Sequence, residues 1–287
     1  MSKAPRNMGA SVRARLLAQS KESGQQFQLV LTRYALERLL YRLSLSPHAG
    51  RFILKGAMLL TSWFDLPMRP TRDVDLLGFG DADSEAMLET FREVFAIEFD
   101  DGVRFDRAAL KVERIRDHLA YGGVRLRTTA NIDGAVVAVV IDVGFGDAIE
   151  PGAEEIDYPV MLDQPAPRLR AYAKETVIAE KFQAMVDLGR ANTRLKDFFD
   201  IWLMTKSFSF EDERLAQAIA ATFARRETAI PQELPDALTQ DFANDREKVV
   251  QWAAFTRDLA IDAGPLSEVV GRLADFLMPH AEAARRL

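Results

Sequence analysis

The amino-acid sequence predicts an α/β core that is preceded by helices and followed by a helical C-terminal half. Three observations lead to this fold class. Apolar residues keep helical spacing in residues 11–45, short β-branched runs and turn signals fill residues 50–143, and helical periodicity returns after about Ala171. We therefore expect an N-terminal helical extension at 1–49, an α/β core at 50–170 and a helical domain at 171–287.

The N-terminal part predicts two helices that are separated near Gly24, because glycine inside a helical pattern often marks a break. In the second helix, leucines between Leu29 and Leu43 recur at helical spacing. Ser46-Pro47 then ends the helical pattern.

The predicted core opens with the apolar run Phe52–Leu54, which is typical of a buried strand. A glycine turn at Lys55-Gly56-Ala57 follows and leads into a helix that extends to about Trp63. After two prolines, a second strand at about residues 73–77 carries two aspartates.

The remainder of the core predicts a helix at about residues 83–95 and several strands within residues 103–143. Asp133-Gly134 lies between two β-branched runs and is a strong signal for a hairpin. Residues 150–170 are rich in proline and acidic residues, so we expect a crossing loop there.

Composition and charge exclude several classes of protein. The 287 residues include no cysteine, which excludes disulfides, thiolate ligands and a cysteine nucleophile, and which fits a cytoplasmic protein. His48, His118 and His280 are too scattered for a histidine-rich metal site. No apolar stretch of about 20 residues exists, so we expect no membrane span.

A run of basic residues between 104 and 127 stands out against the net charge of −6, which is not that of a general nucleic-acid binder. Acidic residues are interleaved with it, so a solvated strand face of mixed charge and a local nucleic-acid contact are both open interpretations. The run comprises Arg104, Arg107, Lys111, Arg114, Arg116, Arg125 and Arg127.

Acidic residues form the first candidate site. Asp73 and Asp75 are two apart on a predicted strand, so their side chains share one face and repel each other unless a cation binds both. Asp142 interrupts the apolar run Val136–Val143, where a carboxylate needs a partner or a metal. The alternative for each residue is a solvated strand end. With carboxylates as the available ligands, the expected cation is Mg²⁺ or Mn²⁺.

The turn at Gly56 adds a second candidate function. Glycine allows the backbone to approach a phosphate, and the N-terminus of the following helix offers N–H groups to an anion. A plain tight turn is the alternative interpretation.

Two helices of the C-terminal half place polar residues where apolar ones are expected. In the predicted helix Lys174–Leu188, Lys181 falls inside the apolar stripe, so it either snorkels at the stripe edge or points toward a triphosphate. The next helix starts near Arg194 and carries Asp197 and Asp200. These two acids either form surface ion pairs, or Asp197 faces the cleft near Lys181 with Asp200 in support.

Taken in order, five segments resemble the AbiEii/AbiGii toxin family, which includes the mycobacterial MenT toxins. The resemblance covers about residues 25–205. Its segments are Phe52–Ala57, Thr71–Leu76, Val140–Val143, Lys174–Lys181 and Arg194–Asp200.

This resemblance implies a polymerase-β-like nucleotidyltransferase core with a mixed sheet. It further implies a toxin of a toxin–antitoxin or phage-defence system that a separately encoded antitoxin neutralises. Such a toxin transfers a nucleotide, often a pyrimidine, from a nucleoside triphosphate to the 3′ end of tRNA and so blocks translation. The same chemistry on a protein or small-molecule acceptor, or a non-catalytic binding module, are the alternatives.

The resemblance also implies roles for individual residues. Asp73, Asp75 and Asp142 would hold the metal, and Lys181 and Asp197 would join Asp73 and Asp75 in catalysis, with the helical domain completing the active-site cleft. Nucleotide binding would fall to Lys55, Gly56, Ala57, Thr71, Arg72 and Lys181. One departure is that Gly56-Ala57 stands where the family usually has Gly-Gly or Gly-Ser, so a serine hydroxyl is absent.

Overall fold

A computed structural model describes residues 7–64, 69–80, 82–115, 122–257 and 259–287. Its strands are β1 (Phe52–Lys55), β2 (Val74–Gly78), β3 (Arg104–Phe105), β4 (Lys111–Ile115), β5 (Gly123–Ile132), β6 (Ala135–Phe145), β7 (Ala153–Asp157) and β8 (Arg168–Tyr172). Its α-helices are α1 (Met8–Ser23), α2 (Phe27–Leu45), α3 (Ala57–Phe64), α4 (Ser84–Ala96), α5 (Lys174–Leu188), α6 (Leu195–Ser207), α7 (Asp212–Arg225), α8 (Gln240–Ala243), α9 (Arg246–Thr256) and α10 (Leu266–Ala284).

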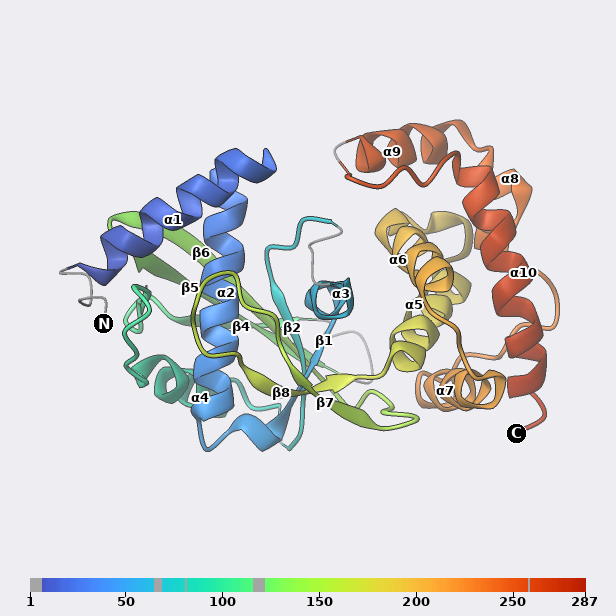
Figure 1. The fold of residues 1–287 in the computed structure, drawn as a ribbon. Helices are drawn as coiled ribbons and strands as arrows, with labels where there is room; N and C mark the ends of the chain where they lie inside the picture. Colours follow the sequence, from blue (N-terminus) through green and yellow to red (C-terminus); the bar gives the residue numbers. More distant parts are fainter. Residues whose placement is uncertain (1–6, 65–68, 81, 116–121, 258) are drawn as a thin grey trace. The chain divides into compact units, whose positions relative to one another are not determined.

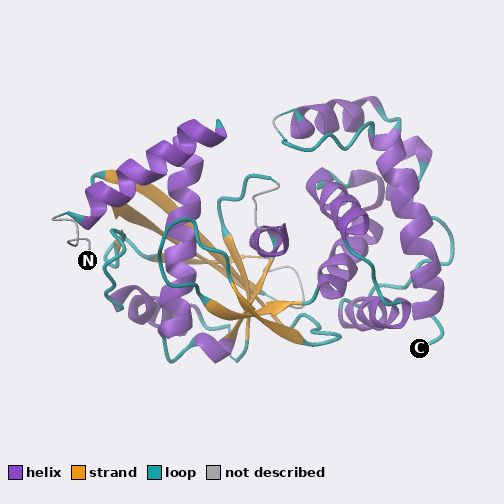
Figure 2. Ribbon diagram, in the orientation of Figure 1, coloured by secondary structure: helices purple, strands orange, loops and turns teal. Residues whose placement is uncertain are grey.

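One mixed sheet joins the eight strands of the described chain (Figures 1 and 2). The strand order is β3-β5-β6-β2-β1-β8-β7, and β4 also pairs with β5. The pairs β2–β6 and β1–β8 are parallel, whereas β1–β2 and β5–β6 are antiparallel. The predicted α/β class with a mixed sheet is therefore confirmed.

The chain divides into two compact units. The first contains Met1–Gly146 and Glu155–Ala171, and the second contains Asp147–Glu154 and Tyr172–Leu287. The N-terminal helices α1 and α2 belong to the first unit. The left-handed backbone of Gly24, with φ of 68°, ends α1, so the predicted break between the two helices is observed.

The β5–β6 hairpin sets the register of the first unit. Asp133 and Gly134 have φ of 46° and 82°, and two left-handed residues make the tight turn that matches the twist of a hairpin. Pairing starts at Ile132↔Ala135 and continues to Gly123↔Gly144. Alternate residues of β6 from Val137 to Val143 are buried, and α2 packs against this strand.

Helix α2 is held by polar as well as apolar contacts. Arg42 donates two hydrogen bonds to the Asp101 carboxylate, at 2.6 and 3.0 Å, and both side chains are buried. A bidentate pair of this kind is shielded from screening, so it fixes α2 against the segment that precedes β3.

The prediction of a crossing loop at 150–170 was wrong, because β7 and β8 lie within or overlap that segment. Strand β7 is the last strand in the sheet order. Its sequence contains Glu154, Glu155 and Asp157, so it lacks the apolar pattern by which a buried strand is predicted. An edge strand needs no continuous apolar face, since one of its sides meets solvent.

Two residues named in the sequence analysis, Arg116 of the basic run and His118, lie outside the described residues.

The second unit is helical, as predicted for the chain after about Ala171, and α5 spans the predicted residues. Aromatic pairs fill its core: the rings of Phe182 and Phe223 lie 5.3 Å apart, and Phe198 stacks on Phe242 at 5.5 Å. All four side chains are buried. Within the described residues, no helix combines the length and the apolar character that crossing a membrane requires.

The buried carboxyl of Glu37 on α2 predicts a pH-dependent stability. Burial raises its pKa to about 7, although its oxygens lie near Arg38 and the Met161 amide. The folded protein therefore binds more protons than the unfolded chain between the ordinary carboxyl pKa and about 7, so the unfolding free energy falls as pH rises through this window. The fall amounts to about 3 kcal/mol at most.

Glu37→Gln should remove this dependence. Urea unfolding at pH 5, 6 and 7.5 measures this effect. As the pH rises, the unfolding free energy of the unmodified protein should fall relative to that of the variant. A constant difference between the two proteins across this range would contradict the assignment.

Candidate active site

The strand registers of the first unit place four charged residues in one row across the sheet. Lys55 on β1 lies opposite Asp75 on β2, Asp75 lies beside Asp142 on β6, and Asp142 lies opposite Arg125 on β5. Directly paired residues point to the same face of a sheet. These four residues therefore form two adjacent carboxylates flanked by two cations, and Glu113 on β4 lies opposite Arg125 as the next member of the row.

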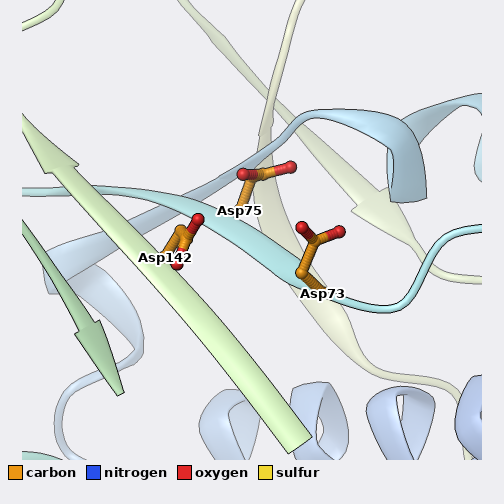
Figure 3. Close-up of side chains that lie close together, drawn as sticks. All are labelled: Asp73, Asp75 and Asp142. Carbon is orange, nitrogen blue, oxygen red and sulfur yellow. The ribbon is translucent and has the colours of Figure 1, made fainter. Parts of the chain in front are cut away.

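Asp73 adds a third carboxylate beside Asp75 and Asp142. It precedes β2 by one residue and shares the face of Asp75, two positions along the chain. One oxygen from each of Asp73, Asp75 and Asp142 lies within 4.8 Å of the others, and all three residues are half-buried. Figure 3 shows the three side chains on the same side of the two strands. The structure thus brings together all three acids that the sequence singled out.

Gly56 is needed here because Asp75 lies against it. Its φ is +73°, in the left-handed region, and a Cβ built on it would come within 2.1 Å of Asp75 Oδ2. The turn between β1 and α3 therefore gives the Asp75 carboxylate room beside the backbone. The sequence suggested that a glycine here lets the backbone approach a phosphate. The structure shows a second reason for glycine, which is that any side chain at this position would overlap the Asp75 carboxylate.

The other residues predicted to bind nucleotide lie close to the acids in the fold. Thr71 donates its hydroxyl to Asp73 Oδ1 at 3.1 Å, so it orients a carboxylate of the acidic site, and its contact with a nucleotide stays a prediction. Ala57 begins α3, Lys55 is buried on β1, and Arg72 is an exposed neighbour of Asp73. These residues belong to the first unit, whereas Lys181 and Asp197 belong to the second.

Arg125, which the sequence showed only as part of a basic run, lies at the acidic site. Its Nε and NH2 atoms each donate to one Asp142 oxygen, both at 2.6 Å. The hydrogen bonds to Asp142 raise the pKa of the Arg125 guanidinium above its ordinary value. A signal existed, because a two-residue turn at Asp133-Gly134 fixes the pairing of β5 with β6 and places residue 125 opposite residue 142.

Two arginines of the basic run are therefore engaged by acids. Arg125 pairs with Asp142, and Arg127 lies 3.0 Å from Glu113 on β4. For these two residues the arrangement fits a strand face of mixed charge, which was one of the two interpretations left open.

The second unit contains a buried cluster of charges around Lys181. The Lys181 ammonium donates to Asp197 at 2.6 Å and to Asp200 at 2.8 Å, and both carboxylates are almost fully buried. Arg194 Nε lies 2.7 Å from the other oxygen of Asp197. Asp197 and Asp200 thus both lie beside Lys181 and are buried rather than paired at the surface, while the orientation of Asp197 toward a cleft stays a prediction. The ammonium is held by two carboxylates rather than extended into solvent.

The donor set of the three acids in the first unit fits a hard divalent cation. Their ligand atoms are all carboxylate oxygens, which Mg²⁺ and Mn²⁺ prefer. Three negative charges this close together repel one another, and a divalent cation removes that cost. The space kept for Asp75 beside Gly56 shows that the backbone is shaped around this carboxylate.

A separate hollow of about 1110 Å³ lies elsewhere in the first unit. It is lined by the start of α1, the segment between α4 and β3, and the turn of the β5–β6 hairpin. Arg104 and Arg107 of the basic run line it, whereas none of the residues predicted for catalysis, nucleotide binding or metal binding does.

Comparisons with known proteins concern the family and the fold of the chain. A protein-family model described as "Nucleotidyl transferase AbiEii toxin, Type IV TA system" matches residues 38–277. A crystal structure of a proposed nucleotidyltransferase from H. pylori is similar, with 17% identity, a TM-score of 0.52 and coverage of 89% of this chain and 97% of that one. The structure of JHP933 from Helicobacter pylori is also similar, with 17% identity, a TM-score of 0.50 and coverage of 90% and 95%.

At this level of identity the two structures establish the likeness of the fold alone. No curated protein matches the sequence.

Gly56→Ala should weaken cation binding at the acidic site. The new methyl group would overlap the Asp75 carboxylate and displace it, in addition to a backbone cost of about 1 kcal/mol for a side chain at positive φ. Gly24→Ala is the matched control, because Gly24 has φ of +68° and no atom near its added Cβ. Mn²⁺ titration followed by electron paramagnetic resonance should show weaker binding in the first variant only; equal affinities would contradict this role of Gly56.

Lys181→Met should destabilise the second unit by about 3–5 kcal/mol, because it leaves Asp197 and Asp200 buried without their shared cation. Combining it with Asp197→Asn and Asp200→Asn should recover part of that loss. Thermal unfolding of the single and triple variants measures both effects. A fully stable single variant would show that the cluster contributes little to the fold.

Proposed function

The chain belongs to the AbiEii family of nucleotidyltransferase toxins, and on that premise we propose that it transfers a nucleotide in a reaction that depends on Mg²⁺ or Mn²⁺. The nucleotide donor is a nucleoside triphosphate, with a pyrimidine preferred, and the acceptor is the 3′ end of tRNA. Loss of a usable tRNA end then blocks translation. The observation that carries this proposal is the convergence of Asp73, Asp75 and Asp142 on one face of the sheet.

Asp73, Asp75 and Asp142 would hold the metal. When bound there, divalent cations would supply charge stabilisation for the triphosphate and would make the attacking hydroxyl a stronger nucleophile. The sheet registers hold Asp75 and Asp142 side by side, and the Thr71 hydroxyl fixes one oxygen of Asp73. These contacts orient the carboxylates before a substrate arrives, which reduces the reorganisation needed in the reaction.

The turn after β1 supports the nucleotide part of the proposal. Gly56 and Ala57 lead into α3, and the N-terminus of a helix favours the negative charge of a phosphate. Lys55, Thr71 and Arg72 are assigned to nucleotide binding together with this turn, on the strength of the family resemblance. Lys181 and Asp197 are assigned to catalysis on the same basis.

The partners follow from the family description, which places its members in type IV toxin–antitoxin systems. We propose a separately encoded antitoxin as the protein partner and tRNA as the acceptor. Phage defence is the proposed biological setting. We propose a cytoplasmic location, because the proposed target, translation, takes place there.

Incubation of the protein with each labelled triphosphate in turn, with and without total tRNA, tests the proposal. Label on RNA that requires Mg²⁺ or Mn²⁺ is the expected result. Label on protein, or on a small molecule from an extract, would replace the tRNA acceptor with another. No transfer under any of these conditions would favour a non-catalytic binding module.

Asp73→Asn should reduce transfer more than about 100-fold, since loss of an outer partner of a metal ligand already costs 10–100-fold. The variant should fold normally, because asparagine keeps an oxygen that accepts the Thr71 hydroxyl. Asp157→Asn makes the same change of charge on exposed strand β7 and should leave the rate of transfer unchanged. Full activity of the Asp73→Asn variant would contradict the metal-dependent mechanism.

A further inference from the structure

Arg125 donates two guanidinium hydrogen bonds that occupy both oxygens of Asp142, one of the three acids of the site. The pair spans two neighbouring strands at a directly opposed position, and each side chain is partly open to solvent, with 32% exposure for Arg125 and 16% for Asp142. Such a pair holds the plane of the carboxylate, because a guanidinium fork fits a carboxylate in one orientation.

The charges of the row explain why a cation is needed at this position. Asp73, Asp75 and Asp142 contribute three negative charges whose ligand atoms lie within 4.8 Å. Arg125 offsets one of them, the charge of Asp142. A guanidinium that close to a metal site also repels an arriving divalent cation, since it competes for the same carboxylate.

We propose that Arg125 is a positioning residue with two separable effects on the acidic site. Its bidentate geometry fixes the Asp142 carboxylate in the orientation needed for nucleotide transfer. Its positive charge lowers the affinity of the metal-free site for divalent cations, so that Asp142 is available to a metal only in competition with Arg125. The first effect rests on the proposed function, whereas the second concerns cation binding alone.

Two substitutions separate the geometry from the charge. Arg125→Lys keeps the charge and loses the fork, and Arg125→Met loses both while it keeps a similar length. Mn²⁺ affinity, measured by electron paramagnetic resonance without nucleotide or RNA, should increase about tenfold in the Met variant and change little in the Lys variant. The kcat for nucleotide transfer at saturating Mn²⁺ should fall in both variants, with little change in KM.

Arg127→Met is the matched control. Arg127 lies two residues along the same strand and the same face, and it pairs with Glu113, a carboxylate outside the three-acid site that lies opposite Arg125 in the strand register. This variant should keep both the Mn²⁺ affinity and the kcat of the unmodified protein. Thermal unfolding in the presence of a chelator should show the Arg125→Met protein less stable than the control variant, and added Mn²⁺ should restore much of the difference.

Each contrary outcome points to a different part of the account. A Met variant that binds Mn²⁺ no more tightly than the unmodified protein would overturn the counter-ion effect, and a Lys variant with full kcat would overturn the positioning effect. A third outcome is that the Arg125 variants change the affinity for Mn²⁺ as expected, but the unmodified protein does not label RNA. This outcome would refute the proposed acceptor and leave the counter-ion effect standing. Failure of the unmodified protein to bind Mn²⁺ would refute the metal site and both effects of Arg125.

Discussion

Three carboxylates on one face of a sheet repel one another, and the register of the strands is what holds them there. The parallel pairing of β2 with β6 sets Asp75 beside Asp142, and the antiparallel pairing of β1 with β2 sets Lys55 opposite Asp75. A shift of one residue in either strand would turn its side chains to the other face and disperse the site. The buried residues of β2 and β6 fix which face of each strand carries its aspartate, and the hairpin turn at Asp133-Gly134 fixes the register of β5 on β6, which sets Arg125 opposite Asp142.

The sequence predicted much of this, and for a physical reason. Helices with clear apolar periodicity, the hairpin with its left-handed turn, and the acids Asp73, Asp75 and Asp142 all carry local signals. The structure differs where the signal is not local. Strands β7 and β8 escaped notice because part of their stability comes from pairing at a sheet edge rather than from apolar sequence. Arg125 was noted only as part of a basic run, because its pairing with Asp142 depends on a residue 17 positions away, which the hairpin register brings opposite it.

Gly56 and Lys181, which the sequence singled out for a nucleotide site, each have a structural role of their own. Gly56 carries a left-handed backbone conformation and leaves space for the Asp75 carboxylate, so its value does not depend on a phosphate. Lys181 holds two buried carboxylates of the second unit together, and Arg194 adds a second cation to the cluster. Loss of activity on changing Lys181 therefore says little about chemistry unless the folded state of the variant is measured as well.

The central claim is that Asp73, Asp75 and Asp142 form one site for divalent cations beside a bound triphosphate. A crystal structure of the protein with Mn²⁺ and a non-hydrolysable nucleoside triphosphate analogue tests it most directly. The account predicts an anomalous scattering peak at about 2.1 Å from oxygens of Asp73 and Asp75, with Asp142 completing the site and the phosphates bound to the same ion. A structure in which Mn²⁺ and triphosphate bind elsewhere, and the three carboxylates keep their metal-free arrangement, would contradict it.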